Sequence, residues 1–166
     1  EDNAITVTGV AEGKTIKYIS GGRTEGSAGD AKNNTVRVES TAYKNTARTA
    51  AGTGTIENVY GGFIGSDKNA GCATGNTVTI TGGIVKTVYG GYTRGTGKTT
   101  GNTVRFTGGT VTGTIYGGSD AKDVKENTLA VSGKRTARQI ANFEKLHYDA
   151  GMAKANDTLL TLKGGA

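Results

Sequence analysis

The feature that most constrains this chain is a nine-residue string that recurs along it. Residues 75–83 have the sequence Gly-Asn-Thr-Val-Thr-Ile-Thr-Gly-Gly, and residues 101–109 have Gly-Asn-Thr-Val-Arg-Phe-Thr-Gly-Gly. Looser copies begin at Asn3, Asn34, Asn127 and Leu159. The spacing from Asn76 to Asn102 to Asn127 is 26 and then 25 residues. A fixed period of this length is typical of proteins built from stacked repeats.

A second motif alternates with the first and consists of an apolar β-branched residue, a tyrosine and two glycines. Its copies occupy 59–62, 88–91 and 115–118, with a weaker one at 19–22. Apolar residues three apart, as in Ile56 and Val59, predict a corner between two short strands. In the first motif Val78 and Ile80 alternate with threonines, which predicts a half-buried strand. We expect the glycine pairs after each strand to supply the positive φ that sharp turns need.

Each repeat holds too few large apolar residues to form a core of its own. Leu, Ile, Val and Phe total 29 of the 166 residues, and a share below roughly 20% is typical of disordered chains. The net charge of +6 is too small, however, to keep the chain unfolded. Parallel stacking of repeats about 4.8 Å apart would join their inward residues into continuous columns. The sequence therefore predicts an all-β fold, a right-handed parallel β-helix (β-solenoid) of about five to six coils of roughly 26 residues.

Two apolar columns and one polar ladder follow from this alignment of the repeats. The first column is expected to contain Ile5, Val36, Val78, Val104, Leu129 and Leu160. The second is expected to contain Val7, Val38, Ile80, Phe106, Val131 and Leu162. A structural ladder of side-chain amides is expected at Asn3, Asn34, Asn76, Asn102 and Asn127.

The repeats extend over almost the whole chain, so residues 1–166 are expected to form a single solenoid segment. The step from Asn34 to Asn76 is longer than the others by about sixteen residues, and the polar stretch 41–53 predicts an insertion loop there. Residues 134–156 fit the repeat least. We favour a degenerate coil in this stretch over a short helix, whose apolar face would contain Ile140, Phe143, Leu146 and Tyr148.

Residues that could carry out catalysis or bind a metal are few. His147 is the only histidine and Cys72 the only cysteine, so we expect no metal site, no internal disulfide and no cofactor. Asp67 and Asp120 recur in loops after glycine pairs, two coils apart, and polysaccharide cleavage needs two carboxylates about 5–10 Å apart. Aspartate is also an ordinary turn residue. A carbohydrate-active β-helix enzyme, a polysaccharide lyase or hydrolase using these loop aspartates, is therefore the alternative to the non-catalytic function that we favour.

The positive charge is distributed along the chain rather than concentrated. Lys and Arg number 20 against 14 Asp and Glu, and no run of five like charges occurs. Motifs that read nucleic acid are absent, and no apolar run approaches about eighteen residues. We therefore expect no nucleic-acid partner and no membrane contact by this segment, and a mildly cationic surface that attracts acidic glycans.

The two repeated motifs together resemble the passenger regions of bacterial type V autotransporters, in particular a Gly/Thr/Asn-rich β-helix group of adhesin-like proteins. The stretches 140–146 and 157–162 also look like a segment found late in such passengers. The resemblance implies a secreted, extracellular protein on the surface of a Gram-negative-type bacterium, exported through an outer-membrane barrel and commonly an adhesin.

The functional hypothesis is a non-catalytic passenger segment of a longer protein that acts as a structural stalk and adhesin. Its partners would be surface molecules of host or neighbouring cells, acidic glycans among them. We expect ligand contact at Phe63, Tyr92 and Arg94, because these residues follow glycine pairs and look exposed. Open strand edges at the two ends predict neighbouring coils or end-to-end self-association.

Overall fold

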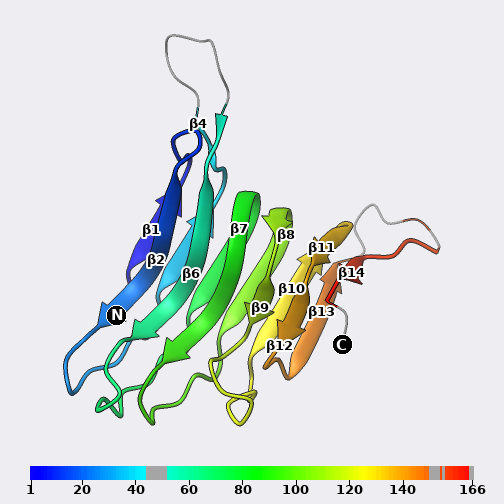
Figure 1. Ribbon diagram of the computed structural model, residues 1–166. Coiled ribbons are helices and arrows are strands. Elements are labelled where there is room, and N and C mark those ends of the chain that lie inside the picture. Colours follow the sequence, from blue (N-terminus) through cyan, green and yellow to red (C-terminus); the bar gives the residue numbers. More distant parts are fainter. Residues whose placement is uncertain (44–51, 150–153, 155, 165–166) are drawn as a thin grey trace.

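The computed structural model describes residues 1–43, 52–149, 154 and 156–164, and these residues form strands, turns and loops without a helix. No helix in this part of the chain is therefore long and apolar enough to cross a membrane. Most strands pair in parallel within one ten-stranded sheet (Figure 1). The strands are β1 (Ala4–Val7), β2 (Thr15–Thr24), β3 (Thr35–Val38), β4 (Ala42–Tyr43), β5 (Gly52–Thr53), β6 (Thr55–Ile64), β7 (Thr77–Thr93), β8 (Thr103–Val111), β9 (Thr114–Tyr116), β10 (Thr128–Ser132), β11 (Arg135–Ala137), β12 (Gln139–Ala141), β13 (Lys145–Asp149) and β14 (Leu160–Leu162). The fold is all-β and mostly parallel.

The first motif forms one row of strands, in the order β1-β3-β7-β8-β10-β13. Its register places equivalent residues of successive repeats opposite one another, and the inward side chains from β3 to β10 are buried. One column contains Ile5, Val36, Val78, Val104, Leu129 and Leu146. The other contains Val7, Val38, Ile80, Phe106, Val131 and Tyr148.

The last residue of each column is not the one predicted from the sequence. β13 occupies it and provides Leu146 and Tyr148, whereas Leu160 and Leu162 lie in β14 and pair with β11. The string after Leu159 has the apolar spacing of the first motif. Because β13 already fills the first-motif row, β14 pairs instead with β11, in a separate two-stranded sheet. As the last strand on its path, β13 leaves Leu146 50% and Tyr148 42% exposed.

The second motif forms the neighbouring row, in which β6 pairs with β2 and with β7, and β9 pairs with β7 and β12. Its columns are made by apolar residues spaced by three, as in Val85 and Val88, which are both fully buried. Strand β7 belongs to both rows, because the chain changes direction near Gly83, whose φ is 81°. Figure 1 shows these strands side by side from the blue N-terminal end to the orange C-terminal end.

The structure brings the five asparagines of the expected ladder together in one line of hydrogen bonds. The side-chain amide of Asn3 donates to Asn34 (2.9 Å), that of Asn34 to Asn76 (2.9 Å), that of Asn76 to Asn102 (3.0 Å) and that of Asn102 to Asn127 (3.4 Å). The last four are fully buried. In addition, the backbone N–H of Asn34, Asn76 and Asn102 donates to the amide oxygen of the next asparagine.

The glycine pairs are of two kinds, and only one kind fits the expectation of positive φ. Gly83 and Gly109, which follow the first motif, have φ of 81° and 71°. The pairs after tyrosine do not have positive φ. There, a Cβ on Gly90 would lie 2.6 Å from the carbonyl oxygen of Gly117 and 2.7 Å from the Cβ of Asn102. Glycine is needed at these pairs because the backbone closely approaches the asparagine ladder.

Two irregular stretches were expected, and both contain strands. In the insertion near 41–53, β4 and β5 form an antiparallel pair that projects from the sheet, and residues 44–51 lie outside the described residues. In the stretch 134–156, β11, β12 and β13 pair in parallel with other strands, and Ile140 lies opposite Ile115. The short-helix alternative is wrong for the described part of this stretch.

Candidate functional site

Five aromatic side chains form a cluster on β6, β7 and β9, which we call the aromatic face. Tyr60, Tyr89 and Tyr116 stack with ring centroids 5.1 and 4.6 Å apart and interplanar angles of 12° and 5°. Phe63 and Tyr92 make a second stack, with centroids 5.3 Å apart and an angle of 7°. The two stacks meet edge to face, as between Tyr60 and Phe63 at 4.9 Å. Each contact is within the range in which aromatic pairs stabilise one another.

The repeat explains why these rings meet. The tyrosine of each second motif occupies the same register position, so Tyr60 lies opposite Tyr89 and Tyr89 opposite Tyr116. Three residues further on, Phe63 lies opposite Tyr92. Because the inward positions are taken by residues such as Val59, the tyrosines are half-buried on the outer side of the sheet.

On the C-terminal side of the aromatic face, the equivalent positions carry small residues. The position opposite Tyr116 in the next strand is Ala141. Beyond Tyr92, Ser119 exchanges hydrogen bonds with the backbone of Thr93. Among the described residues no further ring contacts the free faces of Tyr92 and Tyr116, so one face of each ring is left without an aromatic neighbour.

Burial raises the pKa of two tyrosines on this face. It raises the pKa of Tyr89 to about 12, and the neighbouring tyrosines add to the effect. It also raises the pKa of Tyr60, against the opposing influence of Arg94 and Arg23. The phenols of Tyr60 and Tyr89 therefore stay protonated at neutral pH. Within the described residues, no tyrosine hydroxyl on this face is hydrogen-bonded to the protein or buried without a partner. These hydroxyls are free to donate to a ligand or to water.

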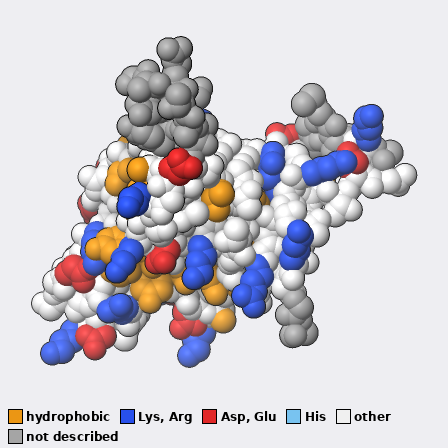
Figure 2. Space-filling view, turned by 45° about the horizontal axis from the view of Figure 1, so that its top comes forward, with side chains coloured by type: hydrophobic (Ala, Val, Ile, Leu, Met, Phe, Trp, Pro, Cys, Tyr) orange, Lys and Arg blue, Asp and Glu red, His pale blue; other side chains and the backbone are white. Residues whose placement is uncertain are grey.

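Cationic side chains border the aromatic face. The guanidinium carbon of Arg23 lies 4.6 Å from the ring centre of Phe63 and 4.7 Å from that of Tyr18, and Arg23 also pairs with Glu25. Arg94 is exposed, and within the described part of the chain it has no ion pair. Figure 2 shows one face of the molecule, on which hydrophobic side chains gather in a patch with basic and some acidic side chains around it.

The expected contact residues are placed together, with one correction. Tyr92 is half-buried and Arg94 exposed, but Phe63 is only 7% exposed. Its ring is covered by Tyr92 on one face and by the Arg23 guanidinium on the other, so Phe63 supports the surface instead of forming it. Sequence reasoning missed the three stacked tyrosines as part of the site. Their recurrence in every clean copy of the second motif was the signal that could have found them.

The loop aspartates of the enzymatic alternative are held in separate turns. The carboxylate of Asp120 accepts from the N–H of Lys122 at 2.9 Å. Asp67 lies in a turn in which the hydroxyl of Ser66 accepts from the N–H of Lys68 at 3.3 Å. Both aspartates are exposed. This is the behaviour of ordinary turn residues.

Residues that could bind a metal do not gather in the described part of the chain. No group of three or more His, Cys, Asp or Glu side chains there could hold an ion. His147 is exposed on β13, and the thiol-bearing Cys72 is half-buried, with its N–H donating to the carboxylate of Asp30 at 2.6 Å.

Known proteins give no match to this chain. No family model, no curated protein and no solved structure matches it. The likeness to autotransporter passengers therefore depends on sequence motifs alone, and the aromatic face is the structural feature from which a function can be derived.

Proposed function

We propose that the chain is a segment of a right-handed parallel β-helix that serves as a rigid stalk. The support is the register of its strands, in which each repeat advances by one strand spacing and equivalent residues form continuous columns. The asparagine ladder adds a buried line of hydrogen bonds parallel to these columns. Six rungs at the spacing of parallel strands would give a rod of roughly 25–30 Å.

The stalk is also an adhesin, and the observation that carries this proposal is the aromatic face. An interior ladder satisfies its own polar groups, whereas the outer tyrosines offer unpaired hydroxyls and ring surface beside an exposed Arg94. Aromatic and arginine side chains are enriched where proteins contact partners. The carboxylate of Asp120 accepts a hydrogen bond from the N–H of Lys122 within its own turn, which is the ordinary role of a turn aspartate and favours a non-catalytic function over polysaccharide cleavage.

The repeated motifs support placing this adhesin outside the cell, as a passenger segment of an autotransporter. Surface exposure is measured by treating intact source cells with a protease and following the chain with an antibody. Loss of the chain from intact cells supports the proposal, and full protection until the cells are broken contradicts it.

Adhesion is tested with the purified chain coupled to beads and presented to cells and to a glycan array. We expect the beads to bind and the glycans to remain uncleaved. The variant Tyr92→Ala should reduce binding, and the matched variant Tyr148→Ala, which removes an exposed tyrosine from β13, should not. Equal binding by both variants would contradict adhesion through the aromatic face, and shortened glycan chains would contradict the non-catalytic function.

A further inference from the structure

We propose that the aromatic face binds an acidic oligosaccharide, one sugar of which stacks on the open ring face of Tyr116 above Ala141. This inference rests on the proposed adhesive function and assigns it a ligand class and a subsite. The sugar chain would lie across the aromatic face, and its carboxylate or sulfate groups would pair with Arg94 and Lys122.

The step at Ala141 provides the space for a sugar ring. Within the tyrosine stack each ring covers the next, so a ligand cannot reach the ring faces between Tyr60, Tyr89 and Tyr116. The stack ends at Tyr116, because the next position in the register is an alanine, whose methyl group is too small to cover a phenol ring. Ala141 and Tyr116 are both half-buried, so part of the surface of each is reached by solvent.

The chemistry of this face fits a sugar. A pyranose presents C–H groups on one face, which pack on an aromatic ring, and hydroxyls at its edge, which accept from phenols. The ring centroids of the tyrosine stack recur at 5.1 and 4.6 Å, about the spacing of parallel strands and close to the length of one sugar unit. An extended polysaccharide can therefore meet successive tyrosines with successive sugars.

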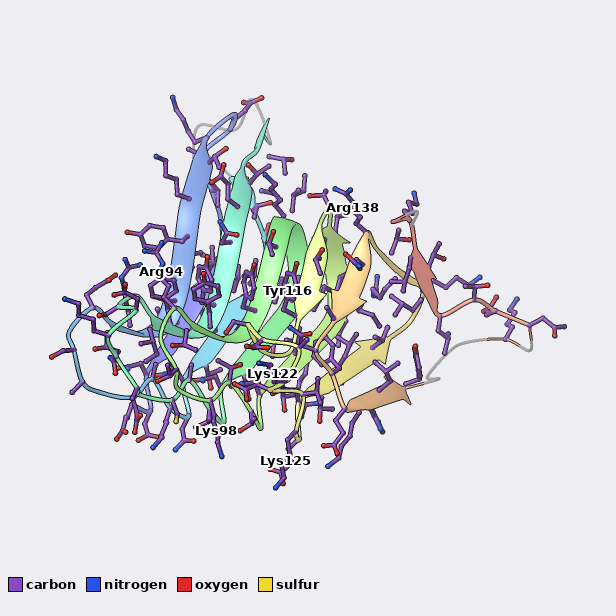
Figure 3. All side chains as sticks on the ribbon, turned by 60° about the horizontal axis from the view of Figure 1, so that its bottom comes forward. Arg94, Lys98, Tyr116, Lys122, Lys125 and Arg138 are labelled. Atoms are coloured by element: carbon purple, nitrogen blue, oxygen red, sulfur yellow. The ribbon has the colours of Figure 1, made fainter. Side chains whose placement is uncertain are left out.

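The charges favour an acidic sugar. Arg94 and Lys122 are exposed, and among the described residues neither has an ion pair. In Figure 3 Arg94 lies to the left of Tyr116, toward β2, and Lys122 lies below Tyr116, in the loop after β9. The nearby carboxylate of Asp120 is engaged by the N–H of Lys122 and that of Asp123 by the N–H of Thr99.

A nucleic acid is a poorer fit to the same surface. Single strands bind by stacking successive bases on successive aromatic faces. Here the tyrosines already cover one another, so no ring face is open between Tyr60, Tyr89 and Tyr116. Successive bases therefore could not stack between these rings, whereas a chain of sugars can also bind the row of hydroxyls.

The experiment measures binding of the full chain to three fluorescent probes: a sulfated oligosaccharide, a uronic acid oligosaccharide and a neutral dextran of the same length. We expect binding of at least one acidic probe and weaker binding of dextran. Tyr116→Ala should weaken acidic binding about tenfold or more, as expected for one lost stacking contact. Ala141→Leu should weaken it similarly, because the larger side chain fills the step without adding a ring.

Charge is tested separately from stacking. The double variant Arg94→Gln and Lys122→Gln should remove the preference for acidic over neutral probes and flatten the dependence on salt. The controls are Arg105→Gln, which removes an exposed cation of β8, and Tyr148→Ala, which removes an exposed tyrosine of β13. Both should bind like the unmodified chain, and all variants should retain the far-UV circular dichroism of the unmodified chain.

The outcomes separate this inference from the adhesive function. Adhesion to cells with no binding of either acidic probe overturns the inference and leaves the function standing. Acidic binding that is unchanged in Tyr116→Ala and Ala141→Leu overturns the stacking subsite. Tighter binding of a single-stranded oligonucleotide than of the sugars, with the same dependence on Tyr116, makes the partner a nucleic acid and also overturns it. Absence of all binding contradicts both proposals.

Discussion

Replacing Asn102 by alanine should lower the free energy of unfolding by about 3 kcal/mol, because it removes a link from the middle of the buried ladder. The amide oxygen of Asn102 accepts from the N–H and the side-chain amide of Asn76, both at 3.0 Å, and its own amide donates to Ala73 at 3.0 Å. In the variant the Asn76 N–H is left in a dry interior without an acceptor. Such a group costs about 1–3 kcal/mol, and each further lost hydrogen bond about 1 kcal/mol.

A matched control is available at the end of the same ladder. Asn3 is exposed, and its side chain donates to Asn34 at 2.9 Å. In Asn3→Ala the Asn34 oxygen keeps the backbone N–H of residue 3 as a donor, at 3.2 Å. No buried group is left unpaired, so we expect a loss below about 1 kcal/mol.

Urea unfolding followed by far-UV circular dichroism measures both variants. The midpoint of Asn102→Ala should fall well below that of Asn3→Ala, while the slopes of the two transitions stay equal. Equal midpoints would mean that the interior hydrogen bonds of the ladder contribute no more than those at its end. The explanation of stability by unpaired buried groups would then be wrong.

Three further changes are tested by the same unfolding measurement. Gly90→Ala should destabilise the fold by about 3 kcal/mol, because its Cβ would lie 2.6 Å from a backbone oxygen, whereas Gly26→Ala, with 3.7 Å to its nearest neighbour, should be nearly neutral. Glu126→Gly should stabilise it by about 1 kcal/mol, since Glu126 has a φ of 60° at a position where two other repeats have glycine. Lys32, and then the N–H of Cys72, lower the pKa of Asp30 below its ordinary value. Its ionised form therefore contributes stability above about pH 4 that is lost as the pH falls, and Asp30→Asn should weaken this acid dependence.

The interior of the fold was largely predictable from the sequence, because stacking in register follows from the repeat itself. Val78 and Val104 occupy the same place in two strings of almost identical sequence, and the structure pairs them. The prediction failed for Leu160, where β13 had already taken its place. Strand β13 has neither the asparagine nor the glycine pair of the motif, so only its alternation of Leu146 and Tyr148 could have indicated it.

The candidate site was less predictable, because exposure depends on what covers a side chain from a neighbouring repeat. Phe63 follows a glycine pair and looked exposed, but Arg23, forty residues earlier in the chain, covers its outer ring face. Repetition could have shown that aromatic residues stack at this position. It could not have shown where the stack ends, since that depends on the alignment of Ala141 with Tyr116 across an irregular repeat.

The aromatic face is a consequence of the asparagine ladder and not a separate feature. Gly90 packs against Asn102 and Gly117 against Asn127, in each case with 2.7 Å between an added Cβ and the asparagine Cβ. The same strand register brings the rings of Tyr89 and Tyr116 to 4.6 Å, directly beside these glycines. Asn102→Ala should therefore weaken the near-UV circular dichroism signal of the tyrosines at urea concentrations at which the variant is still folded. Tyr116→Ala should lower the free energy of unfolding by no more than about 1.5 kcal/mol, because it removes one stacking contact and no buried hydrogen bond.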